Sequence, residues 1–424
     1  MKADFIVENI SEMATAAGRS PLTGTHASDL RVIRDALIAS HNGRIIYAGP
    51  RKAADVEVAH GVRRMDAGAR AVIPGFVDSH THLPFAGDRS NEFLMRMQGR
   101  SYQEIAAGGG GIVTTVRATR EISEDELFAI SQERLDRMLL YGTTTAEAKS
   151  GYGLDLESEM KQLRVLRRLA ASHPVTVIST CMCAHDFPPE YRSSRDEYIS
   201  IISDQILPAV RQAGLAEFFD IFVESGVYTR LQGEVLCRRA ASLGFLLKVH
   251  ADELSDTGGA SLAAEVGAVS AEHLLFASEE GIKKMAAAGV VATLLPGVPL
   301  FLMMDRHAPA RTMIESGVAV AVATDLNPGS SYTESMPLII QLACFRMKMK
   351  IEEALVAATL NAAHGLRRAH EIGSLEPGKW MDALILNSRS FIDLVYHFGV
   401  NPINTVIKRG RIVVGNGYLK KDRK

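Results

Sequence analysis

The sequence predicts an α/β protein, a (β/α)8 TIM-like barrel joined to a small β-sandwich domain that both chain ends form. Short apolar runs rich in Val, Ile, Thr and Ala alternate eight times with helical stretches. In residues 124–142 and 157–172, for example, apolar side chains recur at the three-four spacing of a helix. Regular alternation of strand and helix is typical of a parallel barrel. The eight expected strands are residues 72–79, 143–149, 175–185, 218–224, 246–250, 268–274, 290–295 and 318–325.

The two ends of the chain show a different pattern, which predicts the second domain. Residues 1–70 and 375–424 contain short β patterns separated by turn signals, among them the Asn42-Gly43 dipeptide that is typical of hairpins. Chain termini often lie close together, so the two segments can form one domain. We therefore expect a composite β-sandwich from residues 1–70 plus 375–424, and the (β/α)8 barrel over residues 71–374.

Composition and charge favour an enzyme that acts on a small molecule. The chain has 424 residues, 47% of them hydrophobic, which is enough for one large core or two smaller ones. The formal net charge is −2, and charged residues are spread along the chain without a basic face or an acidic tail. This pattern argues against nucleic acid, a membrane surface or a polyanion as partner.

The cysteines and the N-terminal segment indicate a cytoplasmic protein. Four cysteines are too few and too scattered for a disulfide framework in a chain of this length, so reduced thiols are expected. Cys181 and Cys183 lie two apart on an apolar strand, and we expect them to pack in the core because no second Cys pair completes a metal site. The N-terminal residues lack the apolar segment of a signal peptide.

One uncharged run, residues 285–304, is long enough to span a membrane. Pro296, Gly297 and Pro299 interrupt it in the middle, and such breaks are poorly tolerated in a lone span that faces lipid. A buried strand followed by an apolar loop is the favoured interpretation.

Active residues of such barrels project from the carboxyl ends of the strands. The polar residues at these ends become the candidates for chemistry, and five of the 13 histidines are among them. In chain order these residues are His80, His82, Lys149, Tyr152, His185, Glu224, His250, His273 and Asp325.

The His80-Thr81-His82 triplet predicts a metal site. Residues i and i+2 of a strand point to the same face, so both imidazoles can enter the barrel mouth. Catalytic zinc-type sites use about three protein ligands and an open position for water, and His250 and Asp325 can supply the remaining ligands from across the barrel. Such an ion lowers the pKa of water to about 7 and thereby provides hydroxide without a Ser or Cys triad.

Two further residues are candidates for proton transfer. Glu253, three residues after His250, can take a proton from water and deliver it to a leaving nitrogen if a dry site raises its pKa; otherwise it is a loop carboxylate paired with a surface Lys. His273 can orient the hydroxide or polarise a carbonyl, or it is a core histidine with its hydrogen bonds satisfied.

Loops after the strands supply candidates for substrate binding. Arg89 suits bidentate capture of a carboxylate, although taken alone an arginine is more often a surface residue. Asn327, Gly329 and Ser330 offer donors beside Asp325. The glycine-rich run 106–112 lacks the Gly-Lys-Ser/Thr of a phosphate loop, so a lid or a tight turn is expected there.

Together these residues resemble a known family. The stretches "PGFVDSHTH" and "ATDLNPGSS", with a histidine on each of strands five and six, resemble the amidohydrolase superfamily. Within it, "FAGDR" and "KSGYGLD" are the most specific stretches and look like the imidazolonepropionase family. The resemblance runs from about residue 70 to 375. It implies hydrolysis of the ring amide of 4-imidazolone-5-propanoate to N-formimino-L-glutamate in histidine degradation, and a homodimer.

The resemblance also implies roles for single residues. It implies that one Zn or Fe ion is held by His80, His82, His250 and Asp325. It implies that His273 lies next to the attacking water. It implies contacts with the imidazolone ring and its propionate from Arg89, Tyr152, His185, Glu253, Asn327, Gly329 and Ser330. We count Glu253, His273, Asp325 and His185 as catalytic.

Some positions depart from the family pattern. Cys183 and Asp186 flank the histidine of strand three, and Val298-Pro299 stands where aromatic residues are common; these changes bear on pocket shape. Binuclear relatives carry a carboxylated lysine at the end of strand four, where this chain has Glu224, so one metal is expected. The rival interpretations are a deaminase of an aromatic base, which gives Arg89 no carboxylate to bind, and a metal-free interaction protein with a dead site.

Overall fold

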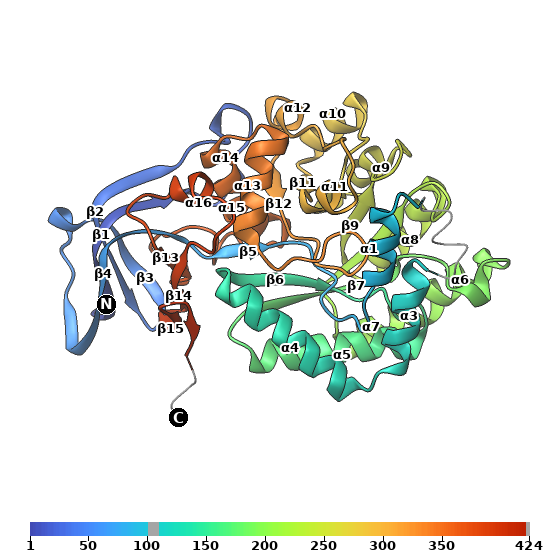
Figure 1. The fold of residues 1–424 in the computed structure, drawn as a ribbon, viewed down its shortest axis with the longest axis horizontal. Coiled ribbons are helices and arrows are strands. Elements are labelled where there is room, and N and C mark those ends of the chain that lie inside the picture. The colour runs from blue at the N-terminus through green and yellow to red at the C-terminus, as the bar shows by residue number, and fades with distance from the viewer. Residues whose placement is uncertain (101–109, 421–424) are drawn as a thin grey trace.

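The computed structural model describes residues 1–100 and 110–420, which form two eight-stranded sheets (Figure 1). In Figure 1 the barrel and its helices lie on the right, and the second sheet lies on the left with both chain termini. Most of the predicted glycine-rich lid or turn at 106–112 lies outside the described residues. Among the described helices, none is both long enough and apolar enough to cross a membrane.

The barrel strands are parallel and follow one another in sequence order. Each predicted strand overlaps one of them, so the predicted barrel is confirmed. The strands are β5 (Phe76–Asp78), β6 (Thr143–Lys149), β7 (Thr176–Ala184), β8 (Phe218–Val223), β9 (Leu246–Ala251), β10 (Ser270–His273), β11 (Val291–Leu294) and β12 (Val320–Val322).

Helices pack around the barrel and follow the strands (Figure 1). Capping residues precede the longer helices. Ser123 caps α4 in a reciprocal capping box with Glu126, and the Asp155 carboxylate accepts a hydrogen bond from the backbone of Ser158 at the start of α5. The α-helices are α1 (Ser90–Met97), α3 (Ile112–Glu121), α4 (Glu124–Leu140), α5 (Leu156–Ser172), α6 (Arg195–Ile201), α7 (Leu207–Ala213), α8 (Arg230–Ser242), α9 (Gly259–Glu265), α10 (Glu279–Ala288), α11 (Gly297–Phe301), α12 (Ala310–Glu315), α13 (Met336–Met347), α14 (Ile351–Ala357), α15 (Leu360–Gly365) and α16 (Asp393–Tyr396). Short 3-10 turns are η1 (Gly24–His26), η2 (Arg51–Ala53) and η3 (Pro189–Tyr191), and η4 (Ile202–Ile206) is a π-helical segment.

The second sheet is formed from both chain ends, as predicted. Its order is β16-β15-β14-β13-β4-β1-β2-β3, and the Asn42-Gly43 hairpin joins β2 to β3. The sheet curls so that Ile45 of β3 exchanges backbone hydrogen bonds of 2.9 and 2.8 Å with Lys379 and Gly378, just before β13. The strands are β1 (Ala3–Thr15), β2 (Arg31–His41), β3 (Arg44–Pro50), β4 (Val58–Pro74), β13 (Ala383–Leu386), β14 (Ile403–Lys408), β15 (Arg411–Gly415) and β16 (Tyr418–Leu419). We propose this sheet as a domain, with boundaries near the predicted 70/71 and 374/375.

Two local predictions need correction. The apolar run 72–79 is not one strand, because residues 72–74 pair with β13 in the second sheet and only 76–78 belong to the barrel. Gly75 separates the two parts, and a β-carbon there would collide with the side chain of Thr144. The apolar loop expected after the strand at 290–295 is instead the short helix α11.

The barrel closes at the ends of its first and last strands. Thr81 and Leu326 form a parallel bridge, the backbone N–H of Asp325 donates to His80 O at 3.0 Å, and the N–H of His82 donates to Leu326 O at 3.0 Å. Below this seam the buried Asp78 carboxylate accepts bonds from the backbone N–H and hydroxyl of Thr324, at 3.0 and 2.6 Å. Barrel closure therefore brings predicted metal ligands of two distant strands together.

Candidate active site

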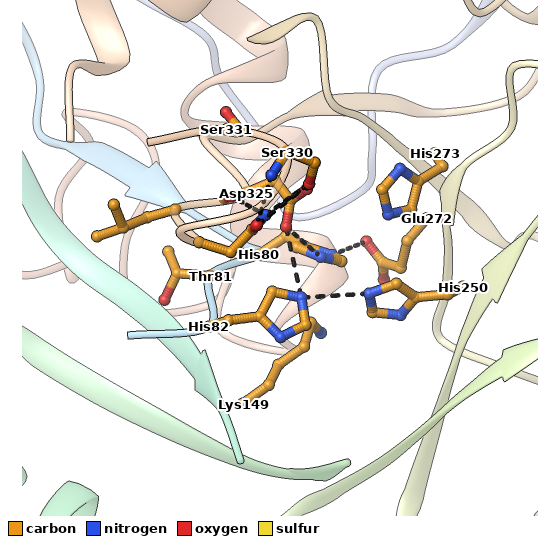
Figure 2. A network of polar contacts seen from close by, with 12 residues as sticks. His80, Thr81, His82, Lys149, His250, Glu272, His273, Asp325, Ser330 and Ser331 are labelled. Atoms are coloured by element: carbon orange, nitrogen blue, oxygen red, sulfur yellow. Dashed lines mark hydrogen bonds and ion pairs between the residues drawn. The ribbon is translucent and has the colours of Figure 1, made fainter. Parts of the chain in front are cut away.

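Four side chains converge at the seam of the barrel, His80, His82, His250 and Asp325 (Figure 2). Asp325 Oδ1 lies 3.3 Å from His80 Nε2 and 3.4 Å from His82 Nε2, and His250 Nε2 lies 3.4 Å from His82 Nε2. All four residues are at most 2% exposed. Ligand atoms of the three histidines lie within 4.8 Å of one another, which is close enough to share one ion.

The protonation states of this cluster suit a cation. Burial lowers the pKa of His80 and of His82 well below the usual value, so both imidazoles are neutral and offer a lone pair. Among the described residues, neither His80 Nε2 nor Asp325 Oδ1 has a hydrogen-bond partner. Burial also raises the pKa of Asp325, and a bound cation would oppose this shift because it favours the carboxylate. Buried nitrogen and oxygen atoms that converge with free lone pairs are suited to act as the ligands of a metal ion.

Carboxylates behind two of the histidines set their orientation. His80 Nδ1 lies 3.0 Å from Glu272 Oε2, and His250 Nδ1 lies 3.0 Å from Asp220 Oδ2. A carboxylate on the far nitrogen fixes the tautomer, so that Nε2 faces the cluster, and this arrangement is common behind metal-binding histidines.

Backbone conformation at two strand ends also directs side chains into the mouth. His273 has φ 68° and Asp325 has φ 51°, in the left-handed region that side chains with a β-carbon seldom adopt. Such strain persists where the surroundings impose it, often at functional sites.

A cavity of about 590 Å³ opens above the cluster. His185 stacks on His82 with ring centroids 4.9 Å apart, and Tyr152 lies 5.3 Å from His185. His185 Nδ1 donates to the backbone carbonyl of Gly151 at 3.0 Å, and burial lowers its pKa to about 3, so the neutral ring keeps Nε2 as an acceptor. Burial also raises the pKa of the Tyr152 phenol, so it stays a donor. These two rings form one wall of the cavity.

Arg89 also lines the cavity, beside the loop that follows β12. Its Nε and Nη2 contact Glu92 Oε2 at 2.9 and 2.7 Å, and both side chains are about nine-tenths buried. Its Nη1 lies so close to Gly329 that a β-carbon at that position would collide with it. The Nε–Nη2 edge of the guanidinium is therefore held by Glu92, while Nη1 lies beside Gly329 and the residue lines the cavity.

The loop after β12 is ordered by Asn327. Its Oδ1 accepts hydrogen bonds from the backbones of Gly329 and Ser330, both at 2.8 Å, and its Nδ2 donates to Asp325 O at 2.8 Å. Asn327, Gly329 and Ser330 all line the cavity. The hydrogen-bond donors predicted on Asn327, Gly329 and Ser330 are thus partly used in hydrogen bonds within the loop itself.

Glu253 and His273 meet beside the cluster. His273 Nε2 lies 3.5 Å from Glu253 Oε2, and the His273 ring lies 5.7 Å from that of His80. Burial, followed by the nearby charge of Glu224, raises the pKa of Glu253 to about 8. The structure thus brings every residue predicted to bind metal or substrate or to act in catalysis to the cluster or to the cavity above it. Two other strand-end candidates lie elsewhere, because Lys149 pairs with buried carboxylates and Glu224 binds the loop after β9.

Comparison with known proteins decides the family. A model described as the amidohydrolase family matches residues 71–413. A curated imidazolonepropionase of Symbiobacterium thermophilum is 49% identical over 99% of this chain and 99% of its own, and one of Geobacillus kaustophilus is 48% identical over 98% and 99%. The chain belongs to the imidazolonepropionase group of the amidohydrolase family. It is a hydrolytic enzyme, and the predicted resemblance is confirmed.

Solved structures show the same amidohydrolase fold at low sequence identity. A zinc-bound adenosine deaminase from Xanthomonas campestris aligns with a TM-score of 0.73 at 21% identity, covering 99% of this chain and 95% of that chain. A guanine deaminase of E. coli aligns with a TM-score of 0.72 at 17% identity, covering 98% and 99%. At such identities the likeness concerns the fold alone.

This amidohydrolase also has a layer of buried charges, of which only Lys149 was named from the sequence, as a strand-end candidate. Lys149 Nζ lies 2.6 Å from Glu147 Oε1 and 2.8 Å from Asp220 Oδ2, and Lys248 Nζ lies 3.3 Å from Glu272 Oε1. All five side chains are fully buried. Burial works against the charge of Lys149, but Asp220 and Glu147 outweigh it and raise its pKa. Charged residues two apart within apolar strands, such as Glu147 and Lys149, were the available signal.

The departures from the family pattern lie around the cavity of the amidohydrolase. Asp186 lines it, and burial raises the pKa of its carboxyl. Cys183 is buried behind the wall, where its carbonyl accepts the Tyr198 hydroxyl at 2.9 Å. Val298 and Pro299 are buried in α11, and Leu302 and Met304 after that helix reach the cavity.

Proposed function

We propose that this enzyme hydrolyses the ring amide C–N bond of 4-imidazolone-5-propanoate and releases N-formimino-L-glutamate, a step of histidine degradation. The observation that carries the proposal is the presence, in one cavity of about 590 Å³, of a cluster that fits a metal ion and of an arginine edge that fits a carboxylate. The substrate has both groups that these features recognise, an amide and a propionate. The similarity to curated imidazolonepropionases over nearly the full chain supports the same substrate.

His80, His82, His250 and Asp325 would hold one Zn or Fe ion. When bound, such an ion polarises the amide carbonyl and lowers the pKa of water, which supplies hydroxide near neutral pH. The position of Glu224 supports one ion rather than two. Its carboxylate accepts hydrogen bonds from Ser225, Leu254 and Ser255 instead of facing the histidines.

Arg89 would bind the propionate through the guanidinium edge that Glu92 leaves open. A charge-assisted contact of this kind orients the substrate as well as holding it. Tyr152 and His185 would contact the imidazolone ring, with the phenol as donor and His185 Nε2 as acceptor. Asn327, Gly329 and Ser330 would complete the propionate side, with Asn327 keeping the loop in shape.

Glu253 would move the proton that the reaction requires. With a pKa near 8 it can accept a proton from water and return it to the leaving ring nitrogen. His273, 3.5 Å from Glu253, would donate to the amide oxygen or to water and so fix the direction of attack.

The test is incubation of the metal-loaded enzyme with 4-imidazolone-5-propanoate while the ultraviolet absorbance of the imidazolone is followed. Loss of absorbance with formation of N-formimino-L-glutamate supports the proposal. Guanine and adenosine serve as comparison substrates, because neither gives Arg89 a carboxylate. Turnover of a base without turnover of the imidazolone would contradict the assignment.

We also propose that the enzyme works as a homodimer in the cytoplasm. Its cysteines are free, as expected in a reducing compartment, and Cys181 and Cys183 pack in the core. Exposed Phe345 and Phe398 form an aromatic pair with centroids 5.9 Å apart, which offers apolar surface for a second copy. Light scattering at micromolar concentration tests the dimer, and a monomer mass would contradict it.

A further inference from the structure

Glu224, at the carboxyl end of β8, is a buried acid that the proposed chemistry does not use. It is 2% exposed. Its side chain reaches the next loop of the barrel, where Oε2 accepts the backbone N–H groups of Leu254 and Ser255 at 2.8 and 3.3 Å, and Oε1 accepts the Ser255 hydroxyl. Hydrogen bonds to an ionised carboxylate are stronger than those between neutral groups. The two amides held in this way directly follow Glu253.

Glu224 is itself held rigidly. Its Oε1 also accepts the N–H of Ser225 at 2.8 Å, and its backbone pairs with Tyr228 and Val227 at 3.1 and 3.0 Å. The carboxylate therefore projects from a closed turn rather than from a free loop. It can act as a fixed anchor for the segment that crosses it.

The residue before Glu253 is anchored from the other side. The Asp252 carboxylate accepts hydrogen bonds from the backbones of Thr257, Gly259 and Ala260 at 3.0, 2.9 and 2.9 Å. Glu253 thus lies between two anchored residues. Its own carboxylate has one ion-pair contact within residues 1–100 and 110–420, with His273 at 3.5 Å. The position of that carboxylate is consequently set by the backbone on either side.

We propose that Glu224 is a positioning residue for Glu253, which it holds against His273 by fixing the main chain of residues 254 and 255. This inference rests on the proposed role of Glu253 in proton transfer. A displacement of about 1 Å in a reacting group can cost about 100-fold in rate. Loss of the hydrogen bonds between Glu224 and residues 254 and 255 should therefore lower kcat, while the metal site and the position of Arg89 stay unchanged.

The experiment is a double-mutant cycle on kcat with Glu224→Ala, Glu253→Gln and the two combined, all in metal-loaded enzyme. We expect Glu224→Ala alone to lower kcat by about 10- to 100-fold, with KM and metal content little changed. Because Glu224 acts through Glu253, adding Glu224→Ala to Glu253→Gln should cost less than threefold more. Glu280→Ala, on the exposed face of α10, is the matched control and should match wild type.

An equal loss from Glu224→Ala in both backgrounds would overturn the inference, because the residue would then act independently of Glu253. If Glu224→Ala does not fold, Ser255→Ala removes a single anchor contact and should lower kcat several-fold without a change in KM; wild-type kcat in that variant would also overturn it. Wild-type enzyme that does not turn over the imidazolone would instead contradict the proposed function.

Discussion

His80 Nε2 lies 3.3 Å from Asp325 Oδ1, and the backbones of the same two residues are joined by a hydrogen bond of 3.0 Å from Asp325 N–H to His80 O. The bond that closes the barrel and the pair of candidate ligands are thus one structural feature. The spacing of these ligand atoms is consequently constrained by the pairing of the chain segments that carry them. Such preorganisation lowers the cost of bringing ligands together around an ion.

Replacing His80 with Ala should empty the metal site while the protein stays folded. The substitution removes one donor, but the closing bond uses only the His80 backbone and remains. Elemental analysis after dialysis should find less than about a tenth of the wild-type metal, with an unchanged far-ultraviolet circular dichroism spectrum. Arg89→Ala is the control and should keep its metal. Equal metal loss in both variants would contradict the division of roles between the two residues.

Replacing Arg89 with Ala should weaken substrate binding more than turnover. The guanidinium is remote from the scissile amide in the proposed complex, so its loss removes binding that ground state and transition state share. We expect KM to rise by about 10- to 100-fold, as for a charge-assisted contact worth about 1.5–3 kcal/mol, with a smaller change in kcat. Steady-state kinetics measure both constants. A fall in kcat at constant KM would show that Arg89 acts on the chemical step instead.

The sequence predicted the barrel and the cluster because both follow from local patterns. His80, His250 and Asp325 each end an apolar run, and in a parallel barrel such ends meet at one face. The charges beneath the cluster escaped prediction for the opposite reason. Lys248 interrupts an apolar strand and resembles a solvent-facing position until the barrel closes around it. Lys149 was named as a strand-end candidate, but its buried partners Glu147 and Asp220 become neighbours only in the folded barrel. Likewise, residues 72–79 are one apolar run, and only pairing with β13, more than 300 residues away, divides it at Gly75.

The pKa of Glu253 predicts how unfolding stability changes with pH. Folding raises this pKa from about 4.5 to about 8, so between these values the folded enzyme binds more protons than the unfolded chain. The contribution of Glu253 to the free energy of unfolding is therefore lost as the pH rises from about 4.5 to about 8. Glu253→Gln removes the effect and should gain stability over wild type as pH rises from 5 to 9. A cation bound at the histidine cluster would lower the pKa of folded Glu253 and so narrow this pH range.

Urea unfolding of both proteins at several pH values measures this difference. The wild type and Glu253→Gln share every other titrating group, so the difference between their unfolding free energies reports Glu253 together with its effect on Asp325, whose pKa it helps to raise. A difference that does not depend on pH between 5 and 9 would contradict a raised pKa at this position.

Replacing Lys149 with Met should destabilise the fold strongly. The lysine lies between Glu147 and Asp220 at 2.6 and 2.8 Å with no exposed surface, so its removal deprives two buried carboxylates of their lysine partner. Breaking a buried ion pair in this way costs about 3–5 kcal/mol. Lys284→Met, which removes an exposed partner of Glu280 on α10, is the matched control and should change stability by less than about 1 kcal/mol. Urea unfolding measures the free energy of unfolding of both variants. An equally small decrease in the two would contradict a structural role for the buried charges.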